Sequence, residues 1–114
     1  MVSKAKRALS AAGDSGGPQS IVAFTTKGNR VCGTGFNSYR KTHPTQAKFA
    51  RIANQPKREY LHAEISALLR SPNDVDTLYV VRFNKQGDPV CARPCPVCRA
   101  AIRIFNPRLK VIHT

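Results

Sequence analysis

Acidic residues are scarce in this sequence, and it contains neither a long hydrophobic run nor a low-complexity block. Of its 114 residues, 19 are Lys or Arg and only 6 are Asp or Glu, giving a formal net charge of +13. No apolar run approaches the roughly 20 residues that a membrane-spanning helix needs. The hydrophobic content of 41% and charged content of 22% are typical of a folded protein, not a disordered one. We therefore expect a single domain, residues 1–114, without a membrane partner.

The N-terminal segment is basic but lacks the apolar core of a secretory signal. Residues 1–13 contain no acid, which leaves a transit peptide open, although a short amphipathic helix is the simpler interpretation. We expect a cytoplasmic protein. In a reducing compartment the four cysteines indicate metal ligands or a redox pair more than disulfides.

Basic residues gather in two stretches without acids. Six of them lie between positions 40 and 58, and no acid follows Asp88. A positive surface raises the local concentration of anionic partners, here nucleotides or nucleic acid. For any single lysine, a solvated surface position is the simpler interpretation.

Hydrophobic periodicity and turn residues predict an alternation of strands and helices. We expect helices at residues 3–12, 45–53, 60–69 and 94–105, and strands at 21–26, 30–36, 77–83 and 109–113, with residues 1–19 forming an N-terminal helix and a flexible connector. Two glycines on one face of the second strand, Gly33 and Gly35, indicate a bend or a close approach by a ligand. The alternation favours an α/β fold with helices on the faces of a sheet.

Both central helices have apolar residues that we expect to be buried. These are Leu61, Ile65, Leu68 and Leu69 in the first helix, and Val97, Ala101, Ile104 and Phe105 in the second.

Two short motifs carry the chemistry of the chain. Residues 62–64 are His-Ala-Glu, and residues 94–98 are Pro-Cys-Pro-Val-Cys. The second motif places two thiols one turn apart at a predicted helix N-terminus, where the helix dipole lowers thiol pKa values. His62, Cys95 and Cys98 make three ligands, and catalytic zinc sites keep three protein ligands with a fourth position for water. Glu64 lies about 200° around the helix from His62 and would take the proton of that water.

Two other interpretations compete with this one. Cys95 and Cys98 as a thioredoxin-like redox pair would leave His62 and Glu64 without a role. Cys91 as a fourth ligand would close a structural Cys₃His site, making a basic zinc module that binds nucleic acid without catalysis. We rank this below the enzyme, because Cys91 falls on the strand or at its exit. Cys32 and Cys91 are more simply core residues.

The paired motifs, in this order and with a strand between them, resemble the zinc-dependent cytidine and deoxycytidylate deaminase superfamily. The resemblance covers roughly residues 20–114. It implies a three-layer α/β/α fold with a mixed five-stranded sheet, and zinc held by His62, Cys95 and Cys98. It also implies that Glu64 moves a proton from zinc-bound water to the leaving ammonia, and that the protein is a homo-oligomer, a dimer or a tetramer.

The same resemblance suggests substrate contacts. It implies that the Ala63 N–H holds the base and that Asn37 binds the sugar, with Phe24 as a wall of the pocket. Arg93 stands before Pro-Cys, where relatives often carry Glu or Ser, and would form a monophosphate pocket with Arg40, Lys41 and His43. We expect a hydrolytic deaminase that converts cytosine to uracil in a free nucleoside or nucleotide, with a base in single-stranded DNA or tRNA as the alternative substrate.

Overall fold

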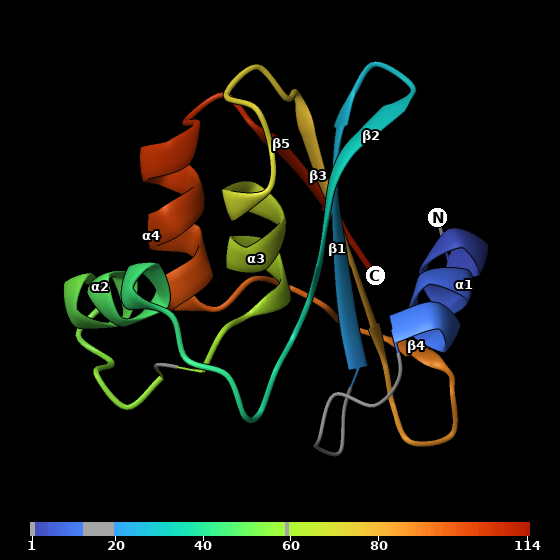
Figure 1. The fold of residues 1–114 in the computed structure, drawn as a ribbon, viewed down its shortest axis with the longest axis horizontal. Coiled ribbons are helices and arrows are strands. Elements are labelled where there is room, and N and C mark those ends of the chain that lie inside the picture. The colour runs from blue at the N-terminus through green and yellow to red at the C-terminus, as the bar shows by residue number, and fades with distance from the viewer. Residues whose placement is uncertain (1, 13–19, 59) are drawn as a thin grey trace.

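The computed structural model describes residues 2–12, 20–58 and 60–114 (Figure 1). Within these residues the elements are α1 (Val2–Ala12), β1 (Ser20–Lys27), β2 (Arg30–Phe36), α2 (Pro44–Ile52), α3 (Ala63–Leu69), β3 (Thr77–Phe83), β4 (Pro89–Val90), α4 (Pro96–Phe105) and β5 (Lys110–His113). All eight predicted elements are present, and the predicted connector falls mostly outside the described residues.

The strands form a mixed five-stranded sheet, as predicted. β1 lies between β2 and β3 and is antiparallel to both. The other edge of β3 is shared by two strands in succession: β4 pairs with Arg82 and Phe83, and β5 runs parallel to residues 77–80. The short β4 was not predicted, because Pro89 and Val90 follow a turn and have no alternating pattern of their own.

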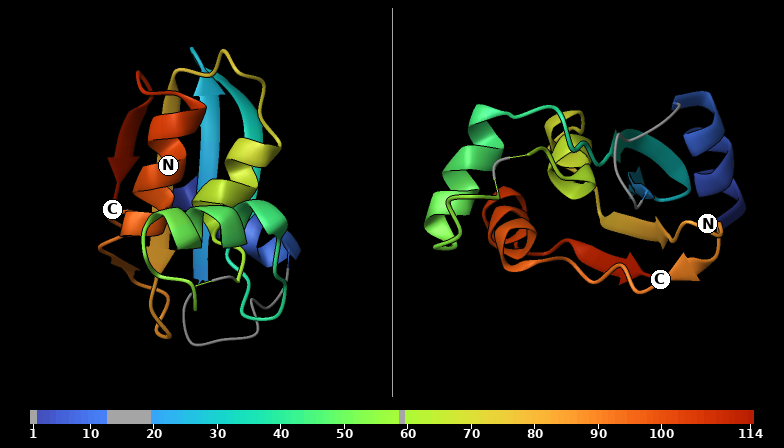
Figure 2. Two further views of the ribbon diagram at one scale, coloured as in Figure 1. Left: turned by 90° about the vertical axis from the view of Figure 1, so that its left-hand side faces the viewer. Right: turned by 90° about the horizontal axis from the view of Figure 1, so that it is seen from below.

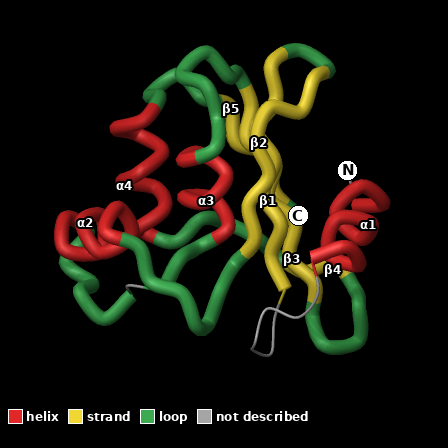
Figure 3. The backbone as a smooth tube through the Cα atoms, in the orientation of Figure 1, coloured by secondary structure: helices red, strands yellow, loops and turns green. Residues whose placement is uncertain are grey.

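Helices cover both faces of this sheet, which confirms the three-layer α/β/α architecture (Figures 2 and 3). On one face, α1 inserts Ala5 into an apolar cluster that includes Phe24 from β1 and Phe83 from β3. On the other face, α3 packs on the sheet, and α2 and α4 pack against α3 and each other. The two faces therefore have separate cores.

The second strand approaches α3 very closely at its two glycines. A Cβ atom on Gly35 would lie 2.3 Å from the Ala63 carbonyl oxygen and 2.3 Å from the Ala67 nitrogen. On Gly33, a Cβ atom would lie 2.8 Å from the Ala67 carbonyl oxygen. The close approach at these glycines is therefore made by a helix backbone and not by the ligand that the sequence suggested.

Helix α3 begins at Ala63, three residues later than predicted. The preceding residues pair with the loop after β2 instead: Leu61 N–H donates to the Lys41 carbonyl at 2.8 Å, and its own carbonyl accepts from Ser38 N–H at 2.9 Å. Ile65 and Leu68 are buried as predicted. Leu69 is 39% exposed, because the helix ends there and its last turn faces solvent.

Helix α4 begins at Pro96, with Cys95 as its N-cap, whereas the prediction began it at Pro94. Val97 and Ala101 are buried as expected, but Ile104 is 60% exposed. Phe105 is also exposed and contacts the ring of Phe49 at a centroid distance of 6.0 Å. The buried face thus comprises Val97, Cys98, Ala101 and Ile102, rotated from the predicted stripe toward the second thiol.

Candidate metal centre

The N-terminal ends of α3 and α4 bring the two motifs together. His62 immediately precedes α3 in an extended conformation, with φ −85° and ψ 153°. Cys95 precedes α4 in a similar conformation, and Cys98 lies in the first turn of that helix. Because helix N-termini carry partial positive charge, this position favours thiolates.

Three side chains converge there. His62 Nδ1 lies 3.2 Å from Cys98 Sγ and 3.5 Å from Cys95 Sγ. All three donor atoms lie within 4.8 Å of one another, and within the described part of the chain no other group of three His, Cys, Asp or Glu residues has this geometry. A tetrahedral zinc ion with ordinary bond lengths places a nitrogen and a sulfur ligand about 3.6 Å apart. The type and spacing of the donors therefore fit zinc.

The two thiols have opposite pKa shifts. The pKa of Cys95 is lowered to about 3, first because the Cys98 thiol donates a hydrogen bond to it and also because His62 lies beside it. The same hydrogen bond, together with burial, raises the pKa of Cys98 well above its usual value. Burial alone would lower the pKa of His62, but the neighbouring Cys95 thiolate raises it. A bound cation would take the place of these shared protons.

Glu64 is buried next to this group, in the first turn of α3. Burial raises the pKa of its carboxyl group, while its backbone N–H and His62 act in the opposite direction. The carboxyl group also interacts with the Cys98 thiol. A carboxyl group with a raised pKa is suited to accepting and returning a proton near neutral pH. His62 precedes the helix, so the angle of about 200° inferred for the pair within one helix does not apply.

Sequence reasoning missed Gln46, a fully buried residue of α2. Its Oε1 accepts a hydrogen bond from the His62 backbone N–H at 3.1 Å, and its Nε2 donates to the Arg58 carbonyl at 3.0 Å. A signal was available. Gln46 precedes Phe49 and Ala50 by three and four residues, so it lies on the buried face of an amphipathic helix, where a polar residue needs partners.

Two of the predicted substrate residues lie in segments that adjoin the metal group: Ala63 follows His62 directly, and Asn37 begins the loop that pairs with the residues before His62. Ala63 is the first residue of α3, and its N–H has no acceptor within its own helix. Asn37 follows β2 and is 8% exposed; its Oδ1 accepts from Ile21 N–H at 2.8 Å. The next residue, Ser38, is hydrogen-bonded to the segment that leads into His62.

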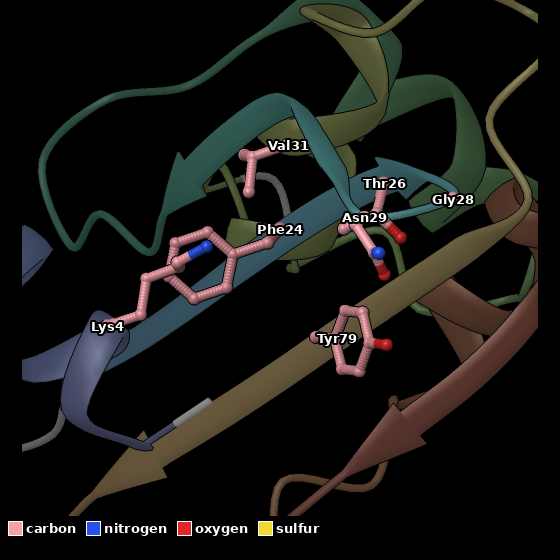
Figure 4. Close-up of a pocket in the computed structure, with 7 residues that line it drawn as sticks. All are labelled: Lys4, Phe24, Thr26, Gly28, Asn29, Val31 and Tyr79. Atoms are coloured by element: carbon pink, nitrogen blue, oxygen red, sulfur yellow. The ribbon is translucent and has the colours of Figure 1, made fainter.

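Phe24 lies elsewhere, because its side chain points to the α1 face of the sheet. There it lines a cavity of about 230 Å³ together with Lys4 and Tyr79 (Figure 4). Neighbouring residues on a strand face opposite sides, and Ala23 is the one that faces α3. The sheet therefore separates Phe24 from the metal group, and the expectation that it forms a wall of the same pocket is wrong.

Two of the predicted phosphate contacts, Arg40 and Arg93, are exposed. Arg40 lies in the loop that pairs with Leu61. Arg93 borders an open groove of about 400 Å³ between α4 and β5, whose lining also includes Arg99 and Arg103. Arg40 is not among the described residues that line this groove.

The remaining cysteines do not join the metal group. Cys91 is exposed between β4 and α4, so its interpretation as a core residue is wrong. Cys32 is half-buried and packs against the core. The described residues therefore offer three ligands to a metal and not the four of a structural Cys₃His site.

The fold and the ligand group agree with a comparison to known families. The chain belongs to the cytidine and deoxycytidylate deaminase zinc-binding region family, whose family model matches residues 1–114. No curated protein matches the chain at a significant level. The predicted resemblance and the zinc cofactor are thereby confirmed, with His62, Cys95 and Cys98 positioned to hold the ion. Across the described residues, no helix is long and apolar enough to cross a membrane.

Proposed function

We propose that this protein is a single-domain, cytoplasmic, zinc-dependent hydrolase that deaminates cytosine to uracil in a free nucleoside or nucleotide. The observation that carries the proposal is the buried carboxyl group of Glu64 beside a group of three ligands. Three ligands leave one coordination position for the reaction, and a carboxyl group at that position can transfer protons.

When held by His62, Cys95 and Cys98, zinc supplies a Lewis acid that makes a water molecule nucleophilic at neutral pH. Glu64 accepts a proton from the attacking water and passes it to the amino group of the base. The oxygen forms a new bond to the carbon that bears the amino group, that group leaves as ammonia, and the second proton of the water ends on the adjacent ring nitrogen, which gives the oxo base. Burial raises the pKa of Glu64, which favours its taking up and releasing a proton.

The residues around this centre would orient the substrate. The Ala63 N–H, at the start of α3, donates to the base, and Asn37 contacts the sugar. The role of Asn37 is supported by the hydrogen bond from Ile21 N–H, which orients the Asn37 side chain, and by its place in the chain beside the loop that pairs with the segment before His62. Arg40 and Arg93 provide charge for a phosphate from the two loops that flank the ligands.

The proposal is tested by following conversion of the amino base to the oxo base. The panel contains cytidine, deoxycytidine, CMP, dCMP, dCTP and adenosine. Glu64→Gln should lower the turnover number by about 10²–10⁴-fold, the usual contribution of a general acid–base group, and should still bind one zinc. Asp88→Asn, an exposed acid in the turn after β3, is the matched control and should keep wild-type turnover. Equal turnover in wild type and Glu64→Gln would contradict the assigned role.

A second candidate substrate is a base in single-stranded nucleic acid, and one observation favours it. Arg93, Arg99 and Arg103 border the groove beside α4, and the last two lie one helical turn apart. The ion pair found within the described residues joins Lys27 and Asp74, so these arginines have no acidic partner there. Guanidinium groups arranged in this way can bind successive phosphates.

Oligonucleotide substrates separate the two candidates. If the groove binds a strand, the double variant Arg99→Ala and Arg103→Ala should weaken binding of a single-stranded oligonucleotide and reduce its salt dependence, leaving dCMP turnover unchanged. Arg30→Ala with Lys85→Ala removes two exposed charges outside the groove, one at the start of β2 and one in the turn after β3, and serves as the control. Equal oligonucleotide binding by both double variants would reject this candidate. Zinc binding without turnover of any substrate would favour a non-catalytic zinc module.

We also propose that the protein is a homo-oligomer, a dimer or a tetramer, as its resemblance to the deaminase superfamily implies. Ile104 on α4 and Ile52 on α2 support this, being 60% and 52% exposed. Sedimentation velocity of the zinc-loaded protein tests it, and a monomer at the highest concentration would contradict it.

A further inference from the structure

Gln46 links the two halves of the metal centre. We propose that it is a positioning residue, which holds the backbone of His62 so that the imidazole meets both thiols. The inference deepens the proposed function and rests on it only through the zinc centre, not through any substrate.

The contacts of the Gln46 amide leave no ambiguity about its orientation. A backbone N–H can only donate and a backbone carbonyl can only accept. The oxygen must therefore face His62 N–H at 3.1 Å, and the nitrogen must face the Arg58 carbonyl at 3.0 Å. Since the side chain is fully buried, water cannot take the place of either partner.

His62 depends on such support because it lies at the boundary between an extended segment and helix α3. It has no side-chain capping bond, and its extended backbone differs from that of the helix that follows. The apolar pattern would allow the helix to start earlier, as the sequence-based prediction from Tyr60 shows. Each residue in a helix turns its side chain by about 100° relative to the one before. A helical His62 would therefore point its ring away from Cys95 and Cys98.

The position of Gln46 on α2 also ties His62 to the other ligands. On the same face of α2, Phe49 and Ala50 pack against α4 in a cluster that contains Val97 and Cys98. Helix α2 thus packs against α4, which carries the thiols, and also holds the backbone of His62 through Gln46. A shift of α2 would move both sides of the metal centre together.

The test compares zinc affinity, measured by chelator competition, in two variants at this position. Gln46→Leu keeps a similar volume and removes both hydrogen bonds; it should raise the zinc dissociation constant by about 10–100-fold, as loss of a group that orients a ligand does. Gln46→Glu keeps an acceptor for His62 N–H and should show a smaller loss. Cobalt substitution should also show an altered ligand-field spectrum in Gln46→Leu.

Asn106 offers a matched control. Its side chain also bridges two backbone groups, donating to the Val75 carbonyl at 2.9 Å and accepting from Arg108 N–H at 3.1 Å, at the far end of α4. Asn106→Ala should lower thermal stability with wild-type zinc affinity and cobalt spectrum. The inference is wrong if Gln46→Leu retains wild-type affinity and spectrum, or if Asn106→Ala weakens zinc binding equally.

If Gln46→Leu does not fold, Gln46→Met, which is unbranched and also removes both hydrogen bonds, decides the same question, and wild-type affinity in that variant together with a wild-type spectrum would overturn the inference. Failure of the proposed function looks different, because turnover would be absent while the zinc affinities still followed Gln46.

Discussion

The two faces of the sheet are held together in different ways. On the α1 face the core cluster is apolar and includes Ala5, Phe24 and Phe83, with Thr26 buried beside it. The α3 face also buries polar groups, among them Gln46 and Glu64. Apolar packing tolerates substitution when volume is conserved, whereas a buried polar network requires each partner in its place. The comparison shows that the metal centre lies on the face whose buried side chains tolerate substitution least.

The substitution with the largest expected effect, Gly35→Ala, tests how closely α3 must approach the sheet. In Gly35→Ala the new methyl group would meet backbone atoms of Ala63 and Ala67, which cannot rotate away. We expect a loss of several kcal/mol in the free energy of unfolding, at or above the usual range of about 1–3 kcal/mol for overpacking. Zinc affinity should also fall, because Ala63 follows His62 directly. Chemical denaturation and chelator competition measure the two quantities.

Gly87→Ala is the control for that substitution. Gly87 has φ +82° in the turn after β3, and a Cβ atom there meets nothing within 4 Å. Backbone strain should lower stability by about 1–2 kcal/mol. Zinc affinity should remain that of the wild type. Equal zinc loss in both glycine variants would show that the close approach of α3 is not specific to the metal centre.

A second pair of substitutions should separate the two faces. Phe24→Ala removes a large side chain from the α1 face and should cost about 3–5 kcal/mol of stability without changing zinc affinity. Val97→Ala, between the two thiols on α4, should cost less stability and still weaken zinc binding. Denaturant titration with zinc competition on the folded protein measures both. Reduced zinc affinity in Phe24→Ala would remove the distinction between the faces.

The smallest effect concerns an exposed carboxylate outside both cores. Asp76 accepts hydrogen bonds from Gly28 N–H and from the Thr77 hydroxyl, each at 2.8 Å, and these lower its pKa. A carboxylate whose pKa is lowered by folding stabilises the fold at pH values above its unfolded-state pKa of about 3.9. This stabilisation is lost as the pH falls through the folded-state pKa. Asp76→Ala should therefore lower the melting temperature slightly at pH 7. The difference from wild type, measured with chelator present, should shrink in acid.

The sequence predicted those features that depend on local pattern. The ligand group His62, Cys95 and Cys98 follows from two short motifs, and the elements follow from periodicity and turns. Features that depend on distant partners were missed. The start of α3 is set by bonds from Leu61 to Lys41 and from His62 to Gln46. Periodicity indicates that Gln46 is buried, but it identifies the partner in neither bond.

The face on which a strand residue lies shows the same limit. Alternation along β1 shows that Phe24 and Ala23 point to opposite sides, but not which side holds the metal centre. Only the packing of α3 against Gly35 settles it. Likewise, the rotation of α4 that exposes Ile104 depends on how α2 and α3 pack against it.

The shared edge of β3 has a consequence for how copies of this protein can meet. Two short strands end to end present a broken row of backbone groups, and β4 begins with Pro89, which has no N–H to offer. On β5, Lys110 adds an exposed charge. On the opposite edge the ladder between β1 and β2 shifts register between Thr25 and Thr26. Neither edge is a good template for another strand, so the sheet is protected against edge-to-edge aggregation, and contacts between copies are left to the helices.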